Sequence, residues 1–382
     1  MGVHTFYTNF IKKHPEIVKP RSECGVYDNL YMDCNSIIYD VFHRIQKMYD
    51  DGELSMETID SMGGIENLVI EEVKKEISKH IKIIAPTKYV FIAFDGEAAK
   101  AKKKQQMKRR ARKLFLEKID GKTPLWNTNE ITAGRPFMNK LSESIYEHFK
   151  AEDFGLEQMD ISCSDEPGEG EHKFLIQEGR DIIYGLDSDL LLMWHIDLYR
   201  KEDEVICVTE LDRPVNKKYI LLGNDYIPGI ASFQELDPID VYVEKVEDFV
   251  EIFKQLQMRR TKSELDVKRP KNLPKVKDCS DYIGTSRMRY YKAMCNTTDV
   301  EDVCRNYWEG LKYSLDVYTY KKSCNDEWCY EYGSVILLCD VLLLFLGVGV
   351  GVGVGVGGLG LVLRELLLLL CEELNLAYKV RL

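Results

Sequence analysis

The sequence predicts an α/β fold, in which a mostly parallel central sheet is flanked by helices and followed by a mainly helical region. Three short apolar runs, at residues 29–33, 88–95 and 181–187, each end in aspartate and have the length of buried strands. Longer segments with helical periodicity, at residues 65–83 and 137–150, separate these runs. Strands and helices that alternate in this way form parallel sheets covered by helices.

The 382-residue chain divides by composition into three parts. We expect an α/β domain at residues 1–235, a helical region at 236–341 and a low-complexity Gly/Val/Leu tail at 342–382. A fourth apolar run, at residues 219–225, is too short to be told from a helix end. Gly and Val alternate strictly over residues 347–357, which fits the expansion of a simple repeat or a frame error, a membrane segment, or a buried element.

Composition restricts the classes of partner and compartment. A formal net charge of −11 argues against a protein that coats nucleic acid non-specifically, because such proteins spread basic charge over a whole face. The 11 cysteines show neither CxxC pairs nor zinc-ligand spacing. The first residues show no charged segment followed by an apolar one, so we expect no secretory signal. We therefore expect reduced thiols and a cytoplasmic protein, with a nuclear location as the alternative and a membrane location disfavoured.

Carboxylates gather where the predicted strands end, and parallel sheets bind their ligands at the carboxyl ends of strands. Four apolar runs end in aspartate, and two acidic pairs spaced i, i+2 accompany them. One such pair alone is more often an ordinary exposed turn, but converging carboxylates are ligands for Mg²⁺, which hydrolysis of a phosphodiester can use. The seven candidates for catalysis and metal binding are Asp33, Asp95, Glu169, Glu171, Asp187, Asp189 and Asp225.

A basic segment follows the second strand. Residues 100–113 contain nine Lys or Arg and no acid in an otherwise acidic chain. In a helix, Lys102, Gln106, Arg109 and Arg110 share one face, which can point into the same crevice as the carboxylates. A solvated charged face and a nuclear-import tract are the simpler interpretations. The position just after a strand-end aspartate favours a pocket for a terminal phosphate, since guanidinium groups bind phosphate through paired hydrogen bonds.

Six ordered motifs resemble the Xrn family of 5′→3′ exoribonucleases. The most specific is Pro-Gly-Glu-Gly-Glu-His, at residues 167–172. The others are Met-Gly-Val-His-Thr-Phe-Tyr at 1–7, Leu-Tyr-Met-Asp-Cys-Asn-Ser-Ile-Ile at 30–38, Phe-Ile-Ala-Phe-Asp-Gly at 91–96, Tyr-Gly-Leu-Asp-Ser-Asp-Leu at 184–190 and Leu-Gly-Asn-Asp-Tyr-Ile-Pro at 222–228. The resemblance implies that residues 1–235 form a 5′ nuclease or PIN-like domain and that residues 236–341 resemble the start of the second conserved Xrn region.

The resemblance also implies roles for single residues. The seven carboxylates would bind the metal ions, and the four residues of the basic face would bind the 5′ phosphate. The family has a base-stacking histidine where this chain has Tyr39, whose ring can still stack. Trp328 is the candidate for the second stacking ring, and Tyr313 is a possible substitute for it. Similarity to the family fades after about residue 341.

The function that the resemblance implies is removal of mononucleotides from single-stranded RNA with a 5′ monophosphate. Two Mg²⁺ ions, or Mn²⁺, would serve as cofactors, and no obligate protein partner is expected. Two alternatives remain. A DNA flap or 5′ nuclease would share the acidic sheet and the metals, but its motifs differ in amino-acid sequence. An inactive RNA-binding scaffold would keep the basic helix but would tolerate loss of the metal ligands, none of which is lost here.

Overall fold

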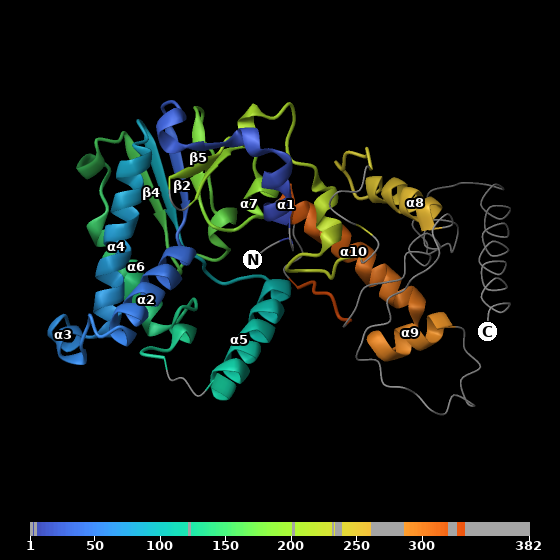
Figure 1. Ribbon diagram of the computed structural model, residues 1–382, viewed down its shortest axis with the longest axis horizontal. Coiled ribbons are helices and arrows are strands. Elements are labelled where there is room, and N and C mark those ends of the chain that lie inside the picture. Colours follow the sequence, from blue (N-terminus) through green and yellow to red (C-terminus); the bar gives the residue numbers. More distant parts are fainter. Residues whose placement is uncertain are drawn as a thin grey trace. The chain divides into compact units, whose positions relative to one another are not determined.

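The computed structural model describes residue 3 and residues 6–120, 124–200, 203–230, 233, 239–260, 286–319 and 327–332 (Figure 1). The chain divides into two compact units. The first comprises Met1–Val215 and Val317–Cys329, and the second comprises Asn216–Asp316 and Tyr330–Leu382. The expected boundary at residue 235 and the expected Gly/Val/Leu tail lie outside the described residues, so both stay predictions.

A mixed sheet forms the centre of the first unit. In the described part of the chain it has seven strands, in the order β1-β7-β6-β5-β2-β3-β4. The strands are β1 (Val18–Pro20), β2 (Asn29–Asp33), β3 (Tyr89–Ala93), β4 (Gln158–Ser162), β5 (Asp181–Tyr184), β6 (Asp197–Tyr199) and β7 (Glu204–Ile206). β4, β3, β2, β5 and β6 are parallel, while β7 pairs antiparallel with both β6 and β1. The predicted mostly parallel sheet and its three predicted strands are confirmed.

Helices flank the sheet, and the two helices expected from periodicity are confirmed as α4 and α6. In the first unit the helices are α1 (Phe6–Lys13), α2 (Asn35–Asp50), α3 (Met56–Ser61), α4 (Ile65–Ile84), α5 (Lys100–Asp120), α6 (Pro136–His148) and α7 (Leu190–Met193). Helices α2, α4 and α6 lie together along the sheet, whereas α5 stands apart from it (Figure 1). The basic segment therefore forms a helix, and several of its described side chains are exposed.

The main core lies between the sheet and the helices α2, α4 and α6. α4 buries Val69, Val73 and Ile77 at a spacing of four residues, which places them on one face. They belong to the same buried cluster as Leu30 and Met32 of β2, whose alternate side chains point to this side of the sheet. Burial of this apolar surface is the main force that holds the strand ends in place.

The opposite side of the sheet is covered by the segment that follows Glu169 and Glu171. The ring of Phe174 lies 5.6 Å from that of Tyr31 and 6.0 Å from that of Phe91, measured between ring centroids. The backbone N–H of Gln177 donates to the Tyr31 hydroxyl at 2.7 Å. Glu169 and Glu171 belong to what we call the acidic segment. Aromatic packing thus holds the residues that follow this segment against the middle of the sheet.

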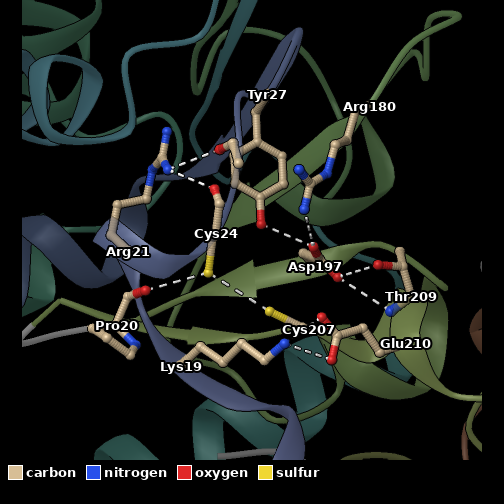
Figure 2. A network of polar contacts seen from close by, with 11 residues as sticks. Lys19, Pro20, Arg21, Cys24, Tyr27, Arg180, Asp197, Cys207, Thr209 and Glu210 are labelled. Carbon is tan, nitrogen blue, oxygen red and sulfur yellow. Dashed lines mark hydrogen bonds and ion pairs between the residues drawn. The ribbon is translucent and has the colours of Figure 1, made fainter.

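The antiparallel edge of the sheet is joined to its parallel part by a polar network (Figure 2). The buried carboxylate of Asp197 accepts hydrogen bonds from the Tyr27 hydroxyl at 2.8 Å and from the Thr209 hydroxyl at 2.7 Å. It also accepts from the backbone N–H of Thr209 at 3.1 Å. The guanidinium of Arg180 lies over the Tyr27 ring, 4.5 Å from its centroid. Asp197 is fully satisfied in this way, as a buried carboxylate must be.

Two cysteines lie side by side in the same network (Figure 2). The Sγ atoms of Cys24 and Cys207 are 3.7 Å apart, and both thiols are free and buried. Burial and the charge of Asp197 raise the pKa of Cys207 to about 12, so this thiol stays protonated at neutral pH. These two side chains therefore act as small apolar groups in the packing.

The second unit is helical where it is described. Its helices are α8 (Asp248–Arg260), α9 (Ser286–Met294) and α10 (Val300–Tyr318), whose last residues belong to the first unit. The fourth apolar run forms a 3₁₀ helix at Lys217–Leu222, which settles the choice left open by its length. The Tyr307 hydroxyl donates to the carbonyl of Pro228 at 2.9 Å and so ties α10 to the loop after this 3₁₀ helix. Among the described residues, no helix combines the length and apolar character needed to cross a bilayer.

Candidate active site

Three of the predicted carboxylates converge at the carboxyl ends of adjacent strands. Asp33 ends β2, Asp95 follows β3, and Glu171 lies in a short 3₁₀ helix at Gly170–His172. One oxygen from each lies within 4.8 Å of the others, and this is the single such group of acidic, His or Cys side chains in the part of the chain described. Residues distant in sequence meet here because β2 and β3 are parallel neighbours.

Glycines allow the acidic segment to approach the strand ends. A Cβ atom on Gly170 would lie 2.9 Å from Oδ1 of Asp33, and the backbone N–H of Gly170 donates to Oδ1 of Asp95 at 2.8 Å. A Cβ atom on Gly96 would lie only 1.7 Å from the carbonyl oxygen of Glu166. A larger residue at Gly96 would have to move the backbone of Glu166, and one at Gly170 would displace the Asp33 carboxylate, so the two glycines allow the close approach of the segments.

Lys173 and Asn35 complete the support of the cluster, and neither was singled out from the sequence. The ammonium of Lys173 donates to the carbonyls of Phe94 and Cys163, at 2.8 and 2.7 Å. The Asn35 side-chain oxygen accepts from the backbone N–H of Asp95 at 3.2 Å. The only signals in the sequence were their positions near predicted ligands: Asn35 follows Asp33 by two residues, and Lys173 follows Glu171 by two residues.

Asp33, Asp95 and Glu171 form what we call the acidic cluster. Three negative charges on this cluster would be unfavourable. Burial raises the pKa of Asp33 well above its usual range, and the charges of Asp95 and Asp187 raise it further. Burial and then the charge of Glu169 raise the pKa of Asp95 and that of Glu171. Oδ1 of Asp33 is buried and accepts no hydrogen bond from the described residues. A divalent cation would satisfy this oxygen and relieve the repulsion, so the donor set fits a metal ion.

Glu169 connects the acidic cluster to the basic helix. Oε2 of Glu169 lies 2.7 Å from the ammonium of Lys102, and the two side chains are only 7% and 14% exposed. The charge of Lys102 also lowers the pKa of Asp33, Asp95 and Glu171 against the stronger effect of burial. The first residue of the predicted basic face therefore lies at the carboxylates themselves.

Asp187 and Asp189 have different surroundings. Asp187 raises the pKa of Asp33 through its charge, and its Oδ1 accepts from the backbone N–H of Asp189 at 3.1 Å. Asp189 is buried; its Oδ1 accepts from the backbone N–H of Val3 at 2.7 Å, and its Oδ2 accepts from the hydroxyl of Tyr318. The structure thus brings Asp187 toward the three converging carboxylates and binds Asp189 to the N-terminal segment and the end of α10.

The predicted basic face of α5 is the half-buried one. Lys102, Gln106, Arg109 and Arg110 are partly buried, and Arg110 donates to the hydroxyl of Thr132 at 2.9 Å. Burial is the main cause that raises the pKa of Tyr39. The charges of Arg109 and Arg110 lower that pKa, and the charge of Asp95 raises it. Charges of both the basic face and the acidic cluster therefore act on the Tyr39 hydroxyl.

The other predicted residues are distributed over both units. Trp328 is partly buried in the first unit, next to Glu327, whose carboxylate lies 4.0 Å from the ammonium of Lys100 at the start of α5. Asp225 belongs to the second unit, in the turn closed by the Gly223–Pro228 bridge. Tyr313 is buried in the second unit, edge-on to Tyr226 at 5.2 Å between ring centroids.

The fold and the site define an α/β protein with buried carboxylates that could hold a divalent cation beside a basic helix. The chain belongs to the family described as the XRN 5′-3′ exonuclease N-terminus, whose model matches residues 1–206. The predicted family is thereby confirmed.

Similar proteins include the 5′-3′ exoribonuclease 2 of Eremothecium gossypii, 30% identical over 252 residues, which are 50% of this chain and 25% of that protein. The 5′-3′ exoribonuclease 2 of Cryptococcus neoformans is 31% identical over 205 residues, 44% of this chain and 17% of that protein. The 5′-3′ exoribonuclease 1 of Saccharomyces cerevisiae is 29% identical over 275 residues, 62% of this chain and 17% of that protein. The chain thus matches a quarter or less of the length of these relatives.

Proposed function

We propose that this chain is a metal-dependent 5′→3′ exoribonuclease that releases mononucleotides from RNA with a 5′ monophosphate. The observation that carries the proposal is the contact between Lys102 and Glu169, which joins the basic helix to the acidic cluster in one site. Metal-binding carboxylates alone would fit many hydrolases, and a basic helix alone would fit many anion-binding proteins. Their direct contact favours a site that cleaves next to a bound terminal phosphate.

The proposed metal ligands are the seven predicted carboxylates, with Asp33, Asp95 and Glu171 as the group whose geometry supports binding best. We propose two ions, Mg²⁺ or Mn²⁺, because oxygen ligands suit these hard cations. Bound ions would supply an activated water and would stabilise the negative charge on the leaving oxygen. Asn35 and the backbone N–H of Gly170 would orient the Asp95 carboxylate, and Lys173 would hold the acidic segment in place.

The proposed phosphate site is formed by Lys102, Gln106, Arg109 and Arg110. A terminal monophosphate carries more charge than an internal phosphodiester, so a basic face beside the metals selects an RNA end. Tyr39 and Trp328 would stack on the terminal base, and the electrostatic link of Tyr39 to Arg109 and Arg110 supports its place beside this phosphate. Repeated binding of each new 5′ phosphate would make degradation processive.

We place this activity in the cytoplasm, with the nucleus as the alternative, and assign it no obligate protein partner. The free thiols of the described cysteines support a reducing compartment.

The proposal is tested with matched substrates that differ at one end. The protein is incubated with 5′-monophosphate, 5′-triphosphate and capped RNA of one sequence, and with the corresponding DNA, in Mg²⁺ or in EDTA. We expect cleavage of the monophosphate RNA only, and only with Mg²⁺. Equal cleavage of all RNA ends would contradict the phosphate site, cleavage of DNA would favour a flap or 5′ nuclease, and binding without cleavage would favour a scaffold.

A further inference from the structure

Helix α5 has a second surface that the proposed active site does not use. Three of the four large hydrophobic side chains that are more than 60% exposed in the described part of the chain lie on α5. They are Met107 at 69%, Phe115 at 65% and Ile119 at 64% exposed. Large exposed apolar groups that gather on one element are a feature of binding surfaces.

Two unpaired cations lie among these apolar side chains. Lys108 and Arg112 are exposed, and neither forms an ion pair or hydrogen bond within the described chain. By contrast, Lys103 nearer the start of the helix pairs with Glu97 at 2.5 Å. Unpaired positive charge therefore lies along the middle of α5, away from Glu97, which precedes the start of the helix.

The five side chains share one face of the helix. At about 100° per residue, Met107, Lys108, Arg112, Phe115 and Ile119 fall within an arc of about 140°. The proposed phosphate-binding residues fall within about 100° on the opposite side of α5. We call the first arc, formed by those five residues, the outer face of α5.

We propose that the outer face of α5 binds the single-stranded RNA that follows the terminal nucleotide. Cations that bind phosphates, interleaved with an aromatic ring on which a base can stack, are the combination that recognises single strands without sequence preference. The charge favours an anionic partner, since no acidic group of the described chain pairs with Lys108 or Arg112. The proposed phosphate site lies on the same helix, and this favours RNA over an anionic lipid or a protein.

The outer face of α5 lies far along the helix from the proposed site of the terminal nucleotide. From Lys102 to Phe115 the helix rises about 20 Å at 1.5 Å per residue, which is too far for one nucleotide to reach both. The outer face would therefore contact downstream nucleotides and hold the RNA between successive cleavages. This inference rests on the proposed function for the identity of the strand.

The test compares RNA length and salt dependence in EDTA, where cleavage is blocked. Dissociation constants are measured by fluorescence anisotropy for 5′-monophosphorylated oligouridylates of 4 and 20 nucleotides. Lys108→Glu with Arg112→Glu should weaken binding of the 20-mer about tenfold or more and leave the 4-mer unchanged. Loss of two phosphate contacts should also reduce the slope of log K against log salt by about 1.4, at about 0.7 per contact.

Matched controls separate the outer face from general charge effects. Lys75→Glu with Lys82→Glu makes the same charge change on exposed positions of α4 and should have little effect on the 20-mer. Phe115→Ala should weaken the 20-mer about fivefold, Phe115→Tyr should restore it, and Met62→Ala, at another exposed hydrophobic residue, should not change it. Circular dichroism checks that each variant keeps its helices.

Several results would overturn the inference. They are unchanged 20-mer binding in both outer-face variants, equal loss for the 4-mer and the 20-mer, or binding of anionic vesicles in preference to the 20-mer. A change in oligomeric state without a change in RNA affinity would assign the face to a second copy instead. Failure of the proposed function is a separate outcome, because it appears as absent cleavage in Mg²⁺ while the anisotropy measurement still reports on the outer face.

Discussion

At the scale of single residues, the acidic cluster lowers the stability of the metal-free folded protein. Asp33 is 8% exposed, lies among other carboxylates and has an oxygen without a hydrogen bond in the described structure. Burial of like charges costs free energy unless a cation compensates for them. Residues that disfavour the fold by themselves and favour a bound ion are typical of functional sites.

Asp33→Asn should therefore stabilise the metal-free protein while it removes the metal site. In EDTA we expect a rise in Tm of about 2–4 °C for each ~1 kcal/mol of repulsion relieved. Mg²⁺ should raise the Tm of the unmodified protein, since a ligand that binds only the folded state stabilises it, but should have a smaller effect on the variant. Differential scanning fluorimetry gives both values, with the exposed Asp51→Asn as a control. A fall in Tm in EDTA would contradict the electrostatic account.

His80 should make stability fall in weak acid. Burial lowers its pKa to about 4; the charge of Lys79 acts in the same direction, and those of Glu76 and Asp40 act against it. Its ring packs on Tyr184 at 4.3 Å between centroids, and its buried Nδ1 has no hydrogen bond in the described structure. Above pH 6.5 the ring is neutral in both the folded and unfolded states. Below that pH the unfolded state takes up the proton first, so stability falls down to about pH 4, by on the order of 3 kcal/mol.

Urea unfolding at pH 7, 5.5 and 4.5 checks this prediction. His80→Phe keeps an aromatic ring against Tyr184 and should lose less stability between pH 7 and pH 4.5 than the unmodified protein does. The difference between the two proteins isolates His80 from the carboxylates that also titrate in this range. Identical pH dependence would show that His80 is already charged or solvated in the folded state.

At the scale of elements, the strand-end carboxylates could be predicted because their signals are local. An apolar run that ends in aspartate indicates both a buried strand and its position, and the structure confirms this for Asp33 and Asp95. The pairing of Lys102 with Glu169 could not be predicted, because it depends on how a separate helix meets a loop. Asn35 and Lys173 were missed because their role is to bond backbone groups of other segments, for which sequence carries no pattern.

The antiparallel edge of the sheet depends on Asp197. Asp197→Ala leaves the Tyr27 hydroxyl and two donors of Thr209 without their buried acceptor, so we expect a loss of about 3 kcal/mol in the free energy of unfolding. Urea unfolding measures it as a lower midpoint. Lys19→Ala removes an exposed ion pair with Glu210 in the same network and should leave the midpoint unchanged. Equal midpoints for both variants would mean that the network does not hold this edge.

At the scale of the whole molecule, two parts of opposite charge come into contact. The acidic sheet and the basic helix belong to one unit and meet at Lys102 and Glu169. In the proposed site, the carboxylates would hold metal ions and the adjoining basic face would hold a terminal phosphate. We propose that the basic face binds the 5′ end of the RNA while the carboxylates carry out the cleavage.

The most direct measurement of this claim is the ratio of kcat/KM for 5′-monophosphate RNA to that for 5′-hydroxyl RNA of the same sequence. We predict a ratio of about 100 or more for the unmodified protein, since a charge-assisted phosphate contact contributes roughly 1.5–3 kcal/mol and several act together. Arg109→Gln with Lys102→Gln should bring the ratio close to 1, whereas Asp33→Asn should lower both values and leave the ratio unchanged. A ratio that stays high in the Arg109 and Lys102 variant would contradict the account.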